Sequence, residues 1–317
     1  MRVGIIIPAI IVTVTVGCTH SRHVALRPGL LYVSHISLDH VTVLDPNTDQ
    51  VIGQIQGGSG PCNVELSPMS SYGYIANYNS NDVTVFDKKT GMAITTVPAG
   101  EHPCHLILTA DAKLLLIGHE SNDGLWFLDT QTNRIVKKLT DGTGILCRQE
   151  SGDKIYQSQI FTPYVFVVDP QRMSLVKNID VGGRPLNVAF SPDQKSLFVA
   201  NFDLNEIEQI DTKTDSVVSR IPGVNNARGI AITPDGRFAY VTNVLSSSVT
   251  IVDLQSSTIV KAISVGEMPT SVAMGSDGKL VYVACQGKPS VDILNTSTRE
   301  LIQSIPVDSN PIEIQLK

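Results

Sequence analysis

The sequence predicts an all-β fold: a seven-bladed β-propeller of four-stranded antiparallel blades, closed by pairing of the C-terminal strand with the N-terminal strands. Two observations predict it. A hydrophobic alternation that closes with an acidic residue or an asparagine occurs seven times, and the chain begins and ends on different strands of the repeated unit. The 317 residues are compatible with one domain, because closed β architectures often exceed the usual domain length.

The repeated unit is about 42 residues long. The closing residues of the alternation are Asp45, Asp87, Asp129, Asp169, Asp211, Asp253 and Asn295. All steps between them are 42 residues except the step from Asp129 to Asp169, which is 40. A period near 42 with four short strands per unit is typical of a propeller blade.

Short alternating strands separated by turn residues fill each repeat. In one repeat, residues 270–274 form the expected first strand, Ser276-Asp277-Gly278-Lys279 the turn, and residues 280–285 the second strand. No segment shows sustained helical periodicity. The repeat that contains residues 145–158 departs most from the pattern, so we expect one irregular blade.

The two ends of the chain predict how the ring closes. Residues 30–35 correspond to the second strand of a repeat, and residues 311–316 correspond to a first strand. We expect these segments to pair, which leaves neither end of the sheet series as an exposed edge.

The first residues have the order of an export signal. Arg2 precedes an uncharged run from Val3 to Val16, which is too short for the ~20 residues of a membrane-spanning helix. Thr15-Val16-Gly17-Cys18 resembles a bacterial lipobox, with Thr15 in place of the usual Leu. We therefore expect a signal peptide at 1–17, a lipid-anchored linker at 18–29 with the lipid on Cys18, and the propeller at 30–317. An ordinary secretory signal and an uncleaved anchor are the alternatives.

This arrangement predicts an extracytoplasmic, membrane-anchored lipoprotein on the outer membrane or the periplasmic face. The lipid would be its contact with the membrane. The net charge is −6 and the basic residues are scattered, so nucleic acid is an unlikely partner.

One known family shares these motifs. The segment Tyr240-Val241-Thr242-Asn243, the Thr233-Pro234-Asp235-Gly236 turn and the strand ending at Asp253 resemble the YVTN-repeat (YncE-like) β-propeller family of bacterial and archaeal extracytoplasmic proteins. The resemblance covers about residues 30–317. It implies the fold and export, but little about function, because one fold hosts unrelated roles.

Loops around the mouth of the central channel are the expected binding face. The polar or thiol residues at the ends of second strands, together with one residue entering a first strand, make up the predicted ligand-binding set: His35, Asn77, His119, Gln159, Asn201, Asn243, Cys285 and Arg228. A second set carries imidazole or thiol groups, which suit copper, zinc or the iron of a haem: His35, His105, His119, Cys62 and Cys104. Hydrogen-bonding strand ends are the alternative for the histidines, and a disulfide or two buried free thiols for Cys62 and Cys104.

These features favour a non-catalytic module that binds a protein, a glycan or a small molecule at the cell envelope. No catalytic residues are predicted, since the sequence has no nucleophile elbow and no phosphate-binding glycine loop. The alternative is a metal- or haem-binding propeller that handles redox chemistry or a cofactor, similar to the propellers of haem nitrite reductases or of nitrous oxide reductase. Lactone hydrolysis is a third hypothesis, with Glu313 and Asp39 as the nearest carboxylates.

Overall fold

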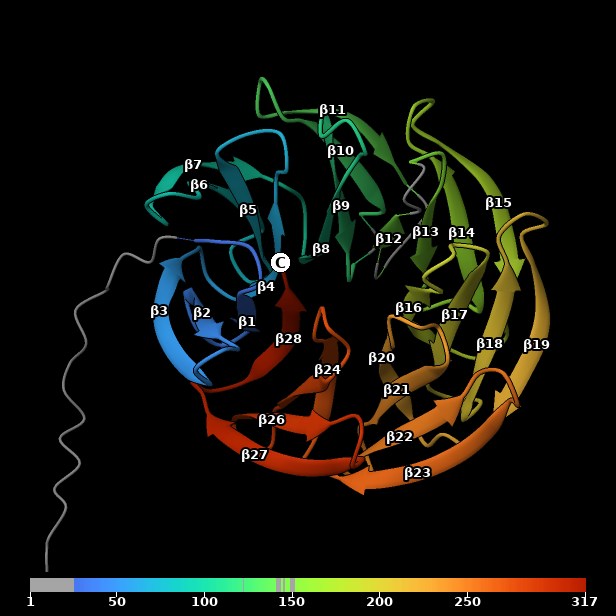
Figure 1. Ribbon diagram of the computed structural model, residues 1–317. Helices are drawn as coiled ribbons and strands as arrows, with labels where there is room; N and C mark the ends of the chain where they lie inside the picture. The colour runs from blue at the N-terminus through green and yellow to red at the C-terminus, as the bar shows by residue number, and fades with distance from the viewer. Residues whose placement is uncertain (1–25, 122, 141–143, 145, 149–151) are drawn as a thin grey trace, which may run out of the picture.

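The computed structural model describes residues 26–317 except residues 122, 141–143, 145 and 149–151. Strands are the only regular elements of this part of the chain, and they form seven four-stranded antiparallel sheets arranged as blades around a central axis (Figure 1). The predicted seven-bladed β-propeller is therefore confirmed. No helix that could cross a membrane occurs in the described residues. The predicted signal peptide and Cys18 lie outside them.

Each blade runs from an inner strand at the channel to an outer strand at the rim. The first three blades contain β28 (Pro311–Leu316), β1 (Leu31–His35), β2 (His40–Asp45) and β3 (Gln50–Gln56); β4 (Pro61–Leu66), β5 (Tyr72–Asn77), β6 (Asp82–Asp87) and β7 (Ala93–Pro98); and β8 (Pro103–Leu108), β9 (Leu114–His119), β10 (Leu125–Asp129) and β11 (Arg134–Leu139). The fourth and fifth contain β12 (Leu146–Arg148), β13 (Ile155–Ser158), β14 (Tyr164–Asp169) and β15 (Ser174–Asp180); and β16 (Pro185–Phe190), β17 (Ser196–Asn201), β18 (Glu206–Asp211) and β19 (Ser216–Pro222). The last two contain β20 (Ala227–Ile232), β21 (Phe238–Asn243), β22 (Ser248–Asp253) and β23 (Thr258–Ser264); and β24 (Pro269–Met274), β25 (Leu280–Cys285), β26 (Ser290–Asn295) and β27 (Glu300–Pro306).

The ring closes as the sequence predicts. The last strand of the chain, β28, is the inner strand of the first blade and pairs antiparallel with β1, with Leu316 opposite Leu31 and Ile314 opposite Val33. Two backbone bonds extend the pairing: Gly29 N donates to the Lys317 carbonyl at 2.6 Å, and Lys317 N donates to that of Leu30 at 3.1 Å. Neither end of the propeller remains an open sheet edge.

Apolar packing between neighbouring blades holds the ring together. Seven clusters of buried side chains occur in the described residues, and each spans two adjacent blades. The cluster at the closure joins Val33 and Ile314 of the first blade to Tyr282 and Ile293 of the seventh. The alternation of the strands explains this, because each sheet turns one apolar face to each neighbour.

The aspartates that close the alternation form the predicted Asx-type turns. In the second blade, Asp87 Oδ1 accepts hydrogen bonds from the backbone N–H groups of Lys89 and Thr90, each at 2.9 Å. Asn295 accepts the equivalent bonds from Ser297 and Thr298. These bonds fix the turn between the third and fourth strands at the face opposite the channel mouth.

The fourth blade is the irregular one, as expected. Its inner strand β12 has three residues, the fewest of any described strand. At its boundary with the third blade, the Gln157 side chain is fully buried, and neither of its polar atoms has a hydrogen-bond partner among the described residues. The equivalent residue of the second blade is Ile75, which is apolar and buried. Among the described residues, Gln157 therefore breaks the apolar pattern of this boundary.

The closure predicts a contrast between two isoleucines near the C-terminus. Ile314 is 2% exposed in the closing strand, whereas Ile302 is 54% exposed on β27. Ile314→Ala should lower the free energy of unfolding by about 2–5 kcal/mol, and Ile302→Ala by less than about 0.5 kcal/mol. Urea unfolding followed by far-UV circular dichroism measures both. Equal effects of the two substitutions would contradict the proposed importance of the closure.

Candidate functional site

The residues at the ends of the second strands are buried and hydrogen-bonded within the propeller. Asn77 Nδ2 donates to Thr84 Oγ1 at 2.8 Å, and Asn243 Nδ2 donates to Thr250 Oγ1 at 2.7 Å. On its other side, Asn77 Oδ1 accepts a bond from the backbone of Gly58, in the loop that enters the blade. The side chain thus ties its strand to the third strand, seven residues further along the chain, and to the loop from the preceding blade.

The same position in the fifth blade has a carboxylate partner. Asn201 Nδ2 donates to Glu208 Oε1 at 2.9 Å, and Arg220 Nη1 lies 3.2 Å from the same oxygen. Glu208 is completely buried, and burial raises its pKa to about 8, with the nearby Glu206 adding to the effect. Asn201 is therefore engaged inside the blade as its equivalents are.

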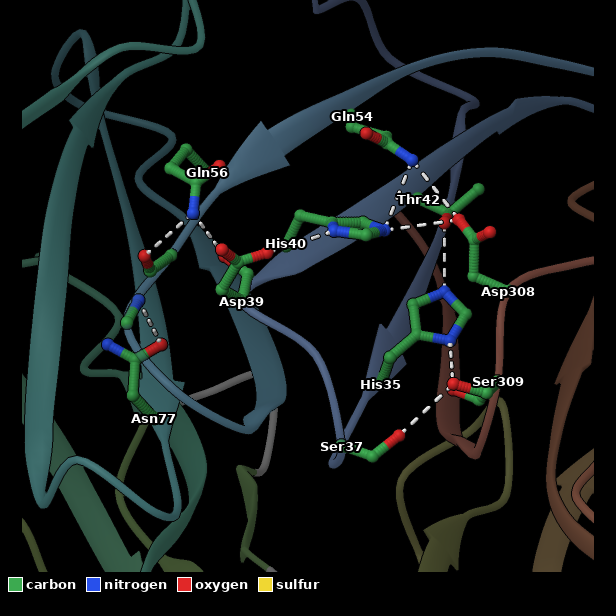
Figure 2. A network of polar contacts seen from close by, with 12 residues as sticks. His35, Ser37, Asp39, His40, Thr42, Gln54, Gln56, Asn77, Asp308 and Ser309 are labelled. Carbon is green, nitrogen blue, oxygen red and sulfur yellow. Dashed lines mark hydrogen bonds and ion pairs between the residues drawn. The ribbon is translucent and has the colours of Figure 1, made fainter. Parts of the chain in front are cut away.

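His35 fills the equivalent position in the first blade, at the junction that closes the ring (Figure 2). Its Nδ1 lies 3.1 Å from the Ser309 carbonyl oxygen and its Nε2 lies 2.8 Å from Thr42 Oγ1. Beside it, His40 Nε2 lies 3.1 Å from Asp308 Oδ2. The network joins β1 and β2 to the loop that precedes β28, so it reinforces the closure. Burial lowers the pKa of His35 to about 4, so the ring is neutral at pH 7.

The other predicted strand-end residues are also buried. His119 Nε2 lies 2.5 Å from the Ala99 carbonyl oxygen and Nδ1 lies 2.8 Å from that of Gly124. Gln159 is 2% exposed, and Cys285 is a fully buried free thiol. Ligand or metal binding by these side chains stays a prediction, and it would require existing contacts to break. Within the described residues, no group of three or more His, Cys, Asp or Glu side chains is placed to hold a metal ion.

His105 lies deeper, on the inner strand β8, where it takes part in a repeated arrangement along the channel. An inner strand is a sheet edge, and its free N–H groups need acceptors. Polar side chains of the preceding blade supply them: Asn63 Oδ1 accepts from Leu106 N at 3.0 Å, and His105 Nδ1 accepts from Leu146 N at 3.4 Å. His105 thus satisfies the backbone of the fourth blade.

At the channel mouth, the structure brings together three of the predicted residues. Cys62, Cys104 and Arg228 line a cavity of about 30 Å³ together with Glu120 and Glu313. Glu313 comes from the closing strand β28, where it accepts a bond from Asn63 Nδ2 at 3.0 Å. A cavity of this size holds about one water molecule.

Burial disfavours the charged forms of the carboxyl and thiol side chains at this mouth. It raises the pKa of the Glu120 carboxyl, an effect that Arg228 opposes and Glu313 reinforces. It also raises the pKa of the Cys62 and Cys104 thiols well above their ordinary value, and the two carboxylates add to this. Both cysteines are free, so the structure contains the two buried thiols and not the disulfide.

A wider pocket of about 350 Å³ lies next to the mouth and shares Glu120 with it. Its other walls are Glu101, His102, Ser121, Asp123 and Phe161. The His102 ring stacks on Tyr78, with centroids 4.3 Å apart and planes 5° from parallel. Among the described residues, no hydrogen bond engages the ring nitrogens of His102. Phe161 is 66% exposed.

The ligand and metal sets predicted from the sequence leave out His102, Glu120 and Phe161, which lie in loops outside the alternating strands. His102 has a left-handed backbone (φ 53°) directly before an inner strand, and the same position holds Gly60, Asn226, Met268 and Asn310 in sister blades. Glycine adopts this conformation without strain, and His and Asn are enriched among the other residues that adopt it. The backbone requirement at this position therefore allows a histidine but does not mark it as a ligand.

Further apolar side chains are exposed on loops of the same face, over the fifth, sixth and seventh blades. Leu204 is 43% exposed, Leu245 71% and Met268 45%. With Phe161 of the fourth blade they form a series of exposed apolar side chains on this face, which we call the apolar arc. Phe161 also lines the acidic pocket, so the arc and the pocket meet at the fourth blade.

Comparisons with known proteins relate part of this chain to haem proteins. Residues 203–314 match the family model described as the cytochrome D1 heme domain. This segment runs from the loop after β17 to the closing strand, and it contains Leu204, Arg228, Leu245, Met268 and Glu313. No curated protein matches the chain.

Solved structures share the propeller fold. Hydrazine synthase from Kuenenia stuttgartiensis is 21% identical with a TM-score of 0.73, over 85% of this chain and 93% of that one. A protein of unknown function from Desulfotomaculum acetoxidans is 15% identical with a TM-score of 0.77, over 90% and 98%. Dihydro-heme d1 dehydrogenase NirN, in complex with DHE, is 17% identical with a TM-score of 0.69, over 92% of this chain and 66% of that one.

The His35 network predicts a pH dependence of stability. The pKa of His35 is about 4 in the folded chain, below its ordinary value of 6.5. Between these two pH values, His35 binds a proton in the unfolded chain but not in the folded chain. Stability is therefore complete above pH 6.5 and is lost as the pH falls toward 4. His35→Asn introduces the residue type that Asn77 supplies at the equivalent position of the second blade. The substitution should reduce the loss of unfolding free energy between pH 7.0 and pH 4.5 by about 2–3 kcal/mol. Urea unfolding of both proteins at pH 7.0 and 4.5 measures it, and an unchanged pH dependence would exclude His35 as its source.

Proposed function

We propose that this protein binds a haem-type tetrapyrrole at the mouth of the propeller channel, with the His102 imidazole as the iron ligand. The main support is the family match over residues 203–314, which contributes Arg228 and much of the apolar arc to the same face as His102. The proposal follows the haem alternative of the sequence analysis. Binding of a protein, a glycan or a small molecule at the cell envelope stays a separate prediction, which co-purification of a partner with the protein from solubilised membranes can test.

The residues of the mouth fit such a group in three respects. His102 offers a nitrogen donor that is free of hydrogen bonds in the described part of the chain, and imidazole is a common haem ligand. Phe161 and the exposed Leu245 offer apolar surface to a flat macrocycle. Arg228 has no ion-pair partner within 4 Å among the described residues, so its guanidinium is available to a carboxylate of the ligand.

The acidic residues of the pocket limit where the ligand's own carboxylates can lie. Glu101 and Asp123 would repel them, so these groups should point toward Arg228 and away from His102. Glu120 lies between the two regions, and its raised pKa allows it to hold a proton more readily than an exposed carboxyl does. The pocket thus favours one orientation of an asymmetric macrocycle.

When bound, a haem-type group supplies redox chemistry at its iron. The chain's own residues position it: the Tyr78 ring holds the imidazole plane of His102 by stacking, and Phe161 offers an exposed apolar wall of the pocket. Glu120 can hold or release a proton at its carboxyl oxygen beside the ligand, which suits a general acid or base.

Substitution of His102 tests the proposal. His102→Asn places the residue of two sister blades at this left-handed position, so the backbone should keep its conformation while the imidazole is lost. Ferric haem b titrated into the purified protein should give a Soret shift that saturates at one equivalent per chain. The variant should bind roughly 10- to 100-fold more weakly and lose the spectrum of an imidazole ligand.

His40→Asn is the matched control, because His40 lies on the same face but its ring nitrogens already contact Asp39 and Asp308. It should bind haem as the unmodified protein does. Equal affinity of the His102 variant, or an affinity loss shared by both variants, would overturn the assignment of His102.

We also propose that the chain is exported and anchored through a lipid on Cys18. The support is the order of residues 1–18 in the sequence. Expressed in a Gram-negative host, the protein should fractionate with membranes and incorporate labelled palmitate, and Cys18→Ser should abolish both. Membrane association without label, or label retained by the variant, would contradict the lipid anchor.

A further inference from the structure

We propose that Cys62 and Cys104 form a two-coordinate site for one soft monovalent metal ion, Cu⁺, inside the channel mouth. The two thiols occupy equivalent positions, each directly after the proline that begins an inner strand, in adjacent blades. Both line the same cavity, whose volume of about 30 Å³ leaves room for little more than a single ion or water molecule. The repeat thus places the two cysteines at the wall of one small cavity.

The two thiols take no part in the hydrogen-bond network of the described residues. Cys62 is 5% exposed and Cys104 is 4% exposed, and neither makes a hydrogen bond to any described residue. They are not cross-linked. In the same channel the neighbouring Asn63 and His105 each satisfy a backbone group, whereas the two thiols make no such contact and stay available to a ligand.

The thiols, and not the overall charge of the cavity, select the metal. Binding turns two neutral thiols into a bis-thiolate complex with a net charge of −1. Arg228 at the same cavity favours this complex, and Glu120 and Glu313 oppose it. Soft thiolates select Cu⁺, which accepts two ligands, whereas zinc requires four, and no group of three metal-binding side chains occurs in the described residues.

Binding is a proton exchange with no change of oxidation state. Each thiol loses its proton to solvent and forms one sulfur–copper bond, so one Cu⁺ enters and two protons leave. Metal binding to thiols releases protons, so the change of pH in weakly buffered solution measures this step. The site does not involve His102, so it can exist whether or not the mouth binds haem.

An anaerobic titration of the reduced protein with Cu⁺, in competition with the chelator bicinchoninate, tests the inference. One Cu⁺ should bind per chain, with two protons released in weakly buffered solution. Cys62→Ser and Cys104→Ser should each weaken binding more than about 100-fold, because each removes one of only two ligands. Cys285→Ser is the matched control, since Cys285 is a buried free thiol of the seventh blade and should leave binding unchanged.

X-ray absorption spectroscopy of the Cu⁺-loaded, unmodified protein gives a readout that does not depend on how a variant folds. The copper should have two sulfur neighbours and no nitrogen neighbour. The inference is overturned if no Cu⁺ binds, if both serine variants bind as well as the unmodified protein, or if the two thiols pass into a mutual disulfide without taking up the metal.

Discussion

The pairing of β28 with β1 is the contact on which the rest of the structure depends. It makes the end of the chain the inner strand of the first blade, so the seven sheets form a ring instead of an open series. It also carries Glu313 to the channel mouth, opposite Cys104 and Arg228. Without that strand, the channel would lack one wall and the mouth would lose one of its carboxylates.

A second constraint is that buried polar groups need hydrogen-bond partners. It separates side chains that are hydrogen-bonded inside the ring from side chains that are free to bind a ligand. Inner strands leave backbone N–H groups facing the channel, and side chains such as Asn63 and His105 accept their hydrogen bonds. Strand ends are engaged in the same way, as Asn77 is by Thr84. Among the described residues, groups without such contacts are found in the loops and at the second positions of inner strands, directly after the first proline. His102, Cys62 and Cys104 therefore differ in kind from the histidines inside the ring.

The repeat predicts the fold because its period, turns and terminal strands are local features. It predicts the site poorly for the same reason. His35 and Asn77 have the residue types of ligands, but whether they face solvent depends on packing between blades, and the structure places both in full burial. The recurring partner seven residues ahead, Thr42 or Thr84, was visible in the sequence and indicates a structural bond. Cys62 and Cys104 line one cavity as free thiols, because equivalent repeat positions converge at a channel.

The central claim is that the mouth of the closed ring is the binding site. Backbone hydrogen exchange, measured by mass spectrometry with and without ferric haem b, tests it directly. The account predicts slower exchange in the loops that carry residues 100–104 and 160–163, with no change in the turns at the opposite face, such as residues 88–92 and 296–299. Protection confined to that opposite face, or no protection at saturating haem, would contradict it.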